Sequence, residues 1–83
     1  MSNFCEGLWV EGHTLTFHFN LLVTHKGMRY CVSVVDAKRI THVFYMRKAF
    51  SRWILDQSIL YPKWITEIEE ELGALIAHRE YLN

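Results

Sequence analysis

Five histidines and two cysteines are the side chains of this sequence that could bind a metal ion. His13 and His18 are five residues apart on one predicted strand, so they point to opposite faces. His13 and His25 share a face but are separated by roughly 40 Å at about 3.3 Å per residue. No pair has the spacing of helical or zinc-finger ligands. We therefore expect no metal ion and no cofactor, although a site assembled from distant residues stays open.

Residues for nucleophilic or acid–base catalysis are also poorly placed. None of the serines lies in a Gly-x-Ser-x-Gly elbow, and no glycine-rich phosphate loop is present. Cys31 lies on a predicted strand, where cysteine usually serves as a small core residue. The acids between positions 67 and 71 begin a predicted helix, where the helix dipole favours a solvated acidic face. We expect a non-enzymatic protein.

Length and composition bound the remaining possibilities. Eighty-three residues form one domain, and 51% hydrophobic with 14% aromatic residues can fill its core. No stretch resembles a signal peptide or reaches the roughly 20 apolar residues of a membrane span. We expect a cytoplasmic protein without membrane contact, in which Cys5 and Cys31 are free thiols rather than a disulfide.

The formal charge is zero, but the charges are segregated along the chain. Residues 12–55 hold seven basic side chains against the single acid Asp36, which gives +6. Residues 56–83 hold two basic side chains against six acids, which gives −4, and Glu6 and Glu11 supply the rest. The sequence therefore predicts a molecule with a basic part and an acidic part.

Apolar residues at alternate positions predict two long strands joined by a hairpin. Residues 14–24 place their odd-numbered side chains inward, and residues 28–35 place their even-numbered side chains inward. A two-residue Lys26-Gly27 turn would use the positive φ available to Gly27. The apolar pairs that this turn predicts are Val23 with Tyr30, Leu21 with Val32 and Phe19 with Val34. A slip of one residue would bury polar groups on the core face.

Two further strands are predicted. Residues 40–46 follow a turn at 36–39, and either face of this strand could point inward because apolar residues occupy both. A short strand at 8–10, ended by Glu11-Gly12, could pair with the start of the first long strand. If Leu8 and Val10 face inward, Trp9 faces outward with Thr16 and His18.

The periodicity then changes to that of a helix. In residues 47–60, Phe50, Trp53 and Leu60 fall on one arc of a helical wheel, which predicts a first helix. Pro62 begins a second helix that extends to about residue 81. Its apolar stripe is about 120° wide at 100° per residue and Gly73 falls opposite it. The stripe contains Trp64, Ile65, Ile68, Leu72, Leu75 and Ile76.

Runs of strands followed by helices indicate an α+β fold. We predict an antiparallel three- to four-stranded β-meander, followed by two C-terminal α-helices packed on one face of the sheet, as a single domain over residues 1–83.

The predicted first helix carries the strongest candidate for a binding surface. Arg47, Lys48 and Arg52 lie opposite its apolar arc, with Leu55 and Ile59 beside them, and the preceding turn adds Lys38 and Arg39. An apolar patch rimmed by charge is typical of protein-binding surfaces. Alternatively, the last helix covers Leu55 and Ile59.

An exposed Trp9 would be a second candidate anchor for a partner. Alternatively, Trp9 is buried under a helix.

Because catalytic and cofactor motifs are absent, the sequence favours a protein partner. We expect a stoichiometric inhibitor or adaptor, of the kind encoded by phages and mobile elements, that occludes its partner's surface. The alternative is a nucleic-acid-binding module that uses the basic segment 38–52. A homodimer is also compatible with the sequence.

Overall fold

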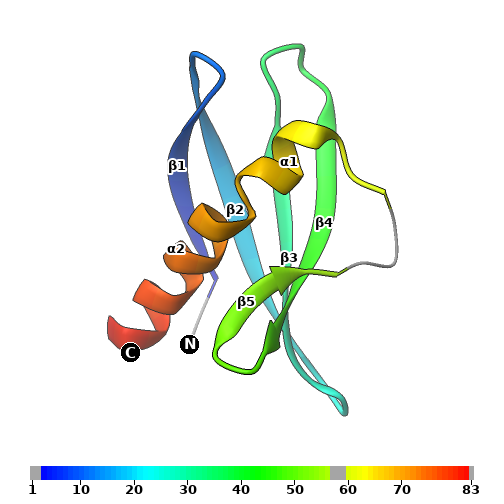
Figure 1. Ribbon diagram of the computed structural model, residues 1–83, viewed down its shortest axis with the longest axis vertical. Helices are drawn as coiled ribbons and strands as arrows, with labels where there is room; N and C mark the ends of the chain where they lie inside the picture. The colour runs from blue at the N-terminus through cyan, green and yellow to red at the C-terminus, as the bar shows by residue number, and fades with distance from the viewer. Residues whose placement is uncertain (1–2, 57–59, 83) are drawn as a thin grey trace.

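The computed structural model describes residues 3–56 and 60–82 as a five-stranded antiparallel sheet with two C-terminal helices. The strands are β1 (Phe4–Val10), β2 (His13–Thr24), β3 (Gly27–Val35), β4 (Thr41–Ala49) and β5 (Arg52–Leu55), and the helices are α1 (Lys63–Glu67) and α2 (Glu69–Leu82). Each strand pairs with the next along the chain, so the sheet is a meander in the order β1-β2-β3-β4-β5 (Figure 1). The predicted α+β class is confirmed, with five strands rather than three or four.

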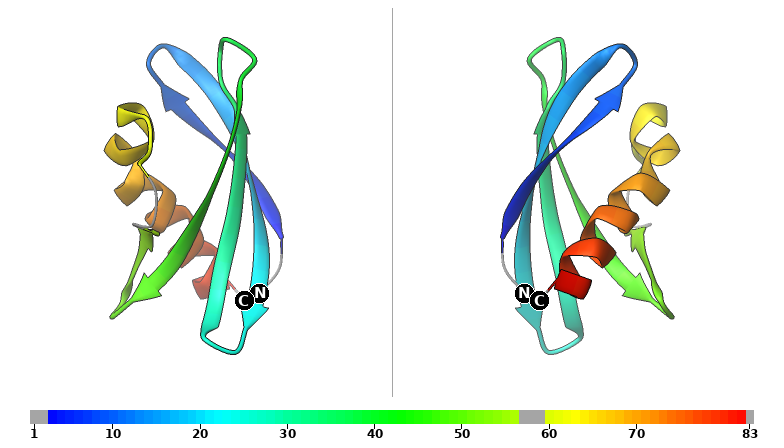
Figure 2. Two further views of the ribbon diagram at one scale, coloured as in Figure 1. Left: turned by 90° about the vertical axis from the view of Figure 1, so that its right-hand side faces the viewer. Right: turned by 90° about the vertical axis from the view of Figure 1, so that its left-hand side faces the viewer.

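Both helices lie on the same side of the twisted sheet, as the side views show (Figure 2). Their apolar stripe faces the sheet as predicted, because Ile65, Leu72 and Ile76 are buried and Trp64 packs against them. The sequence predicted one continuous helix from Pro62, but the structure has two helices there. Pro62 caps α1, and Ile68, with φ −103°, separates α1 from α2.

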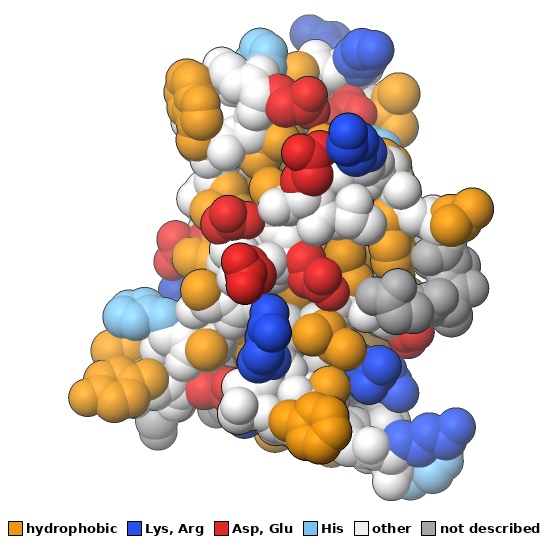
Figure 3. All heavy atoms as spheres, viewed as in Figure 1, with side chains coloured by type: hydrophobic (Ala, Val, Ile, Leu, Met, Phe, Trp, Pro, Cys, Tyr) orange, Lys and Arg blue, Asp and Glu red, His pale blue; other side chains and the backbone are white. Residues whose placement is uncertain are grey.

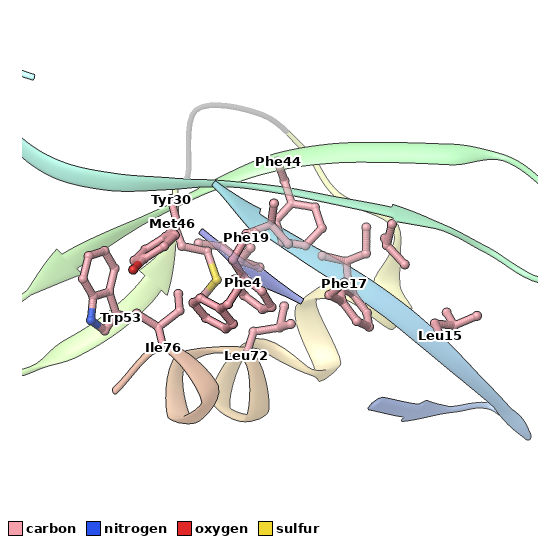
Figure 4. Close-up of a cluster of buried hydrophobic side chains, with 14 of the residues drawn as sticks. Phe4, Leu15, Phe17, Phe19, Tyr30, Phe44, Met46, Trp53, Leu72 and Ile76 are labelled. Carbon is pink, nitrogen blue, oxygen red and sulfur yellow. The ribbon is translucent and has the colours of Figure 1, made fainter. Parts of the chain in front are cut away.

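The core lies between the sheet and the helical layer. Phe4, Phe19, Tyr30 and Trp53 form a chain of ring contacts across it, with the parallel Phe4 and Phe19 rings 4.5 Å apart (Figure 4). Side chains from all five strands reach this core, so each strand buries apolar side chains away from water on one face only.

The predicted β2–β3 hairpin is present, but its predicted register is wrong by two residues. Thr24 pairs with Gly27, so His25 and Lys26 form the turn, and Phe19 lies opposite Val32 instead of Val34. Lys26 N donates to Thr24 Oγ1, which stabilises this earlier turn. Since the side-chain period of a strand is two, a slip of two residues leaves every side chain on the same face, and alternation alone cannot detect it.

The two-residue turn between β1 and β2 uses Glu11 and Gly12, both with positive φ, as the sequence suggested for this position. β1 is longer than predicted, since it begins at Phe4, and Val10 faces inward as expected.

The predicted helix at 47–60 is wrong over its described part. Residues 47–49 continue β4, Phe50 and Ser51 form a turn, and residues 52–55 form β5. Phe50 takes φ 59° and its side chain is fully exposed, so it contributes nothing to the apolar arc on which the helix prediction depended. Residues 57–59 lie outside the described residues.

Gly73 does not lie opposite the apolar stripe, contrary to the sequence prediction. It is buried where α2 crosses β5, and a Cβ there would stand 2.7 Å from the backbone oxygen of Trp53. Glycine at this position therefore lets the helix approach the strand closely enough to close the core.

Candidate functional site

One whole face of the sheet has no helix over it among the described residues, and we call it the open face. It consists of the side chains that point away from the helices. Along each of the five strands, these residues alternate with the residues that face the core. Its members are Cys5, Gly7, Trp9, Thr14, Thr16, His18, Asn20, Leu22, Arg29, Cys31, Ser33, Val35, Thr41, Val43, Tyr45, Arg47, Ala49, Arg52 and Ile54.

The composition of the open face is unlike that of an ordinary solvated surface. Its strand positions include three arginines but no lysine and no acid. Large apolar side chains remain exposed there, with Val43 at 51%, Tyr45 at 42% and Val35 at 52% exposure. Interfaces between proteins are enriched in tyrosine, tryptophan and arginine and depleted of lysine and glutamate.

The register brings these residues into rows across the strands. Val43 lies beside Ser33, and Tyr45 lies beside Cys31. Arg29 and Arg47 are direct cross-strand partners nearer the β4–β5 turn. The open face therefore has an apolar and hydroxyl-bearing centre with an arginine-rich end.

Five of the nine acids lie on the two helices. Figure 3 shows acidic side chains in a band across the helical layer, with basic side chains at both ends of the view. The segregation of charge along the sequence is partly undone in space, because Lys48 and Arg52 of the strands pair with Glu80 and Glu70 of α2.

Several helix acids are not simply a solvated face, as the sequence suggested, because they contact β5. Glu69 Oε2 accepts from the backbone N of Leu55 at 2.7 Å, and Glu70 pairs with Arg52 at 3.3 Å. Glu80 accepts from Trp53 Nε1 at 2.7 Å. These carboxylates connect the short edge strand to α2.

The structure separates the residues of the predicted helix surface. Arg47 is on the open face, whereas Lys48 pairs with Glu80 at 3.2 Å and Arg52, although at an open-face position of β5, pairs with Glu70 at 3.3 Å. Leu55 is 1% exposed and belongs to the core, so the interpretation of Leu55 as an exposed anchor is wrong. Ile59 lies outside the described residues.

Lys38 and Arg39 are in the turn between β3 and β4, whereas Arg47 is near the other end of β4. At about 3.3 Å per residue, the length of β4 separates them by roughly 25 Å. The basic segment 38–52 therefore does not form one continuous patch.

Trp9 is 72% exposed, as predicted if Val10 faces inward. It lies on the edge strand β1 and, with Trp64 and Glu67, lines a depression of about 220 Å³ beside α1. Trp9 thus extends the exposed apolar surface beyond the edge of the open face.

Two polar pairs stand out among the histidines. Cys5 Sγ and His18 Nδ1 are 3.0 Å apart on the open face, and both cysteines are free thiols. His42 Nε2 donates to Asp36 Oδ2 at 2.8 Å. This hydrogen bond, with those from the backbone of Ile40 and Lys38, lowers the pKa of the Asp36 carboxyl below its usual value.

Within residues 3–56 and 60–82, no three His, Cys, Asp or Glu side chains gather as a metal site requires. Neither helix in this part of the chain has the length and apolar character needed to cross a membrane.

Sequence reasoning did not select Val35, Val43, Tyr45 or Arg29, which the structure places on the open face. The signal was the alternation of residues 41–49, in which the odd positions continue outward through Arg47. Assigning Arg47 to a helix ended the predicted strand at residue 46, three residues before the end of β4.

The chain is thus an α+β domain with a five-stranded antiparallel meander, helices on one face and the other face open. It matches no protein-family model, and the comparisons with curated proteins and with solved structures find no match either.

Proposed function

We propose that this domain is a non-enzymatic protein-binding module and that the open face is its docking surface. The observation that carries the proposal is the composition of that face, which combines arginine, tyrosine and exposed valine without lysine or glutamate. Val43 and Tyr45 would supply the desolvated centre, and Arg47, beside the Arg29–Asp56 pair, would form hydrogen bonds at the rim.

A rigid sheet supports this role because its backbone is already ordered before binding. The strands on either side hold the outward side chains in fixed rows, so little conformational entropy is lost on association. In such a module, function consists of covering a partner's surface, as in a stoichiometric inhibitor or adaptor of a phage or mobile element.

Arg29 pairs with Asp56 and Arg52 pairs with Glu70, so Arg47 is the open-face arginine without a carboxylate partner among the described residues. Its charge favours a partner whose contact surface is acidic around an apolar centre. Opposite charges on the two proteins would accelerate their encounter, and the acidic helical layer would disfavour docking through the wrong side. Charge complementarity therefore also orients the complex.

Photo-crosslinking tests the proposal. A photoreactive phenylalanine derivative replaces Val43 on the open face, and the matched control replaces Glu71, which is exposed on α2. In extracts of the source cells, we expect a protein adduct at position 43 that excess unmodified domain abolishes, and none at position 71.

A second variant checks that the adduct reports binding through this face. Val43→Glu places an acid at the centre of the open face and should weaken capture of the same protein at least about tenfold. Adducts at position 71 alone would contradict the proposed surface. Adducts of position 43 with nucleic acid, lost with rising salt, would replace the protein partner with the nucleic-acid alternative.

A further inference from the structure

A depression of about 290 Å³ lies where the β2–β3 turn meets the end of β4 and the start of β5. Four of its lining residues are cationic: Lys26, Arg29, Arg47 and Lys48. Trp53 also lines it. Four cations around one small concavity form a local concentration of positive charge within a domain whose net charge is zero.

The positive charge is only partly neutralised by neighbouring acids. Arg29 pairs with Asp56 at 3.3 Å, and Lys48 pairs with Glu80 at 3.2 Å. Among the described residues, no carboxylate oxygen lies within 4.0 Å of the charged groups of Lys26 or Arg47. Within the described part of the chain, Lys26 and Arg47 at the depression therefore have no acidic partner.

The sheet register adds a cost to this arrangement. Arg29 and Arg47 are direct cross-strand partners, and like charges at directly opposed positions destabilise a sheet. An anion between or beside them would remove that repulsion. The arginine forks can donate two parallel hydrogen bonds to an oxyanion, and lysine contributes a point charge.

We infer that this depression is a binding site for an oxyanion with two negative charges, of the phosphate monoester class. The two uncompensated cations, Arg47 and Lys26, match a dianion in charge. The inference does not depend on the proposed protein partner, because it concerns an anion that the domain binds alone.

The test is a titration of the purified domain with inorganic phosphate at about pH 8, where phosphate is a dianion, against chloride at equal ionic strength. Backbone amide NMR signals report the site. We expect saturable shifts confined to residues 26–29 and 47–48, with a dissociation constant roughly in the millimolar range. O-phosphoserine should bind similarly, whereas dimethyl phosphate, a monoanion, should bind more weakly.

Two variants that remove one positive charge each provide the matched comparison. Arg47→Gln should weaken phosphate binding about tenfold, and Lys38→Gln, at the opposite end of the sheet, should leave it unchanged. Unchanged melting or better in chloride would show that Arg47→Gln folds. Shifts that never saturate, equal binding by both variants, or equal affinity for dimethyl phosphate would overturn the inference. None of these results would bear on crosslinking at Val43.

Discussion

Arg47 is the residue at which the proposed binding role and stability oppose each other. Its direct cross-strand partner is Arg29, and no carboxylate among the described residues pairs with it. A site that attracts anions is expected to be strained in their absence, because the repulsion that the ligand relieves is present in the free domain. The free protein therefore carries a local defect that a ligand would correct.

We accordingly expect Arg47→Gln to raise the free energy of unfolding by about 0.5 kcal/mol in chloride buffer, as removal of an opposed like charge should. Urea denaturation followed by circular dichroism measures the change. Lys38→Gln, which removes a charge from an exposed turn, should leave the stability nearly constant. A less stable Arg47→Gln protein would show that Arg47 has favourable contacts of its own.

Leu55 belongs to the interior, and its substitution separates a core role from a surface role. With 1% exposure, Leu55→Ala should lower the free energy of unfolding by about 2–5 kcal/mol, through lost burial and a residual cavity. Val43→Ala, on the open face, should change it by only about 0.5 kcal/mol. Chemical denaturation of the two variants side by side measures this difference, and equal small losses would mean that Leu55 is not packed.

At the scale of elements, the contact of α2 with β5 depends on the absence of a side chain. In an isolated helix, alanine is more stable than glycine by about 1 kcal/mol. At position 73, a Cβ would instead meet the Trp53 backbone oxygen at 2.7 Å and displace the helix. We expect Gly73→Ala to lower the melting temperature measured by calorimetry, against the trend of helix propensity.

The neighbouring exposed position is the control for that experiment. Ala74→Gly should destabilise by about 1 kcal/mol through propensity alone, so alanine is favoured at 74 and glycine at 73. A Gly73→Ala protein that melts higher than the parent would refute the close approach.

The β3–β4 turn is held by Asp36, whose carboxylate accepts from His42 and from two backbone N–H groups. The pKa of Asp36 is lowered in the folded protein, mainly by the His42 hydrogen bond. Its contribution to stability is therefore complete above the unfolded-state pKa and is lost as the pH falls through the lower folded-state value. Asp36→Asn should be less stable than the parent at neutral pH.

That difference should shrink as the pH is lowered below about 4, because the Asp36 carboxylate of the unfolded chain takes up a proton before that of the folded protein does. Denaturant unfolding of both proteins between neutral and acidic pH measures it. The exposed turn acid Glu11, changed to Gln, is the comparison. A constant difference at every pH would assign the effect of Asp36→Asn to something other than charge.

The elements also show what the sequence determines locally. Strict alternation in residues 14–24 and the helical stripe of residues 64–76 were enough to predict β2 and the helical layer, because each has one buried face. Residues 47–55 were not predictable in this way. Residues 52–55 form β5 because they pair with β4 and because Gly73, Glu69 and Glu80 of α2 contact them. All of these are tertiary contacts.

The candidate site was predicted in part for the same reason. Trp9, Arg47 and Arg52 were selected from residue type; the structure exposes Trp9 and Arg52 and leaves Arg47 half-buried. Leu55 was misassigned because a helical wheel and a strand place it on different faces. The remaining residues of the open face became visible only when the register brought four neighbouring strands together.

At the scale of the molecule, the acids of α2 are partly neutralised by basic side chains of the neighbouring strands. Lys48 of β4 and Arg52 of β5 form ion pairs with Glu80 and Glu70, which connect both strands to α2. Reversing those two charges would disturb the fold as well as any docking. Arg47 is the better position for testing electrostatic steering, because it is not committed to such a pair.

The strand order has a consequence for the rate at which the protein folds. Every pairing in the sheet joins strands adjacent along the chain, so most of its contacts have low sequence separation, and low contact order predicts fast folding. The described ion pair with the greatest sequence separation joins α2 to β1, where Arg79 pairs with Glu6 at 3.3 Å and lies over the Phe4 ring. This closure of the two ends of the chain should form after the transition state.

Arg79→Met should therefore accelerate unfolding and leave the folding rate almost unchanged, as expected for a position with a φ-value near zero. Stopped-flow refolding and unfolding in urea measure both rates. A folding rate that falls in proportion to the lost stability would instead place the docking of the C-terminal helix in the folding nucleus.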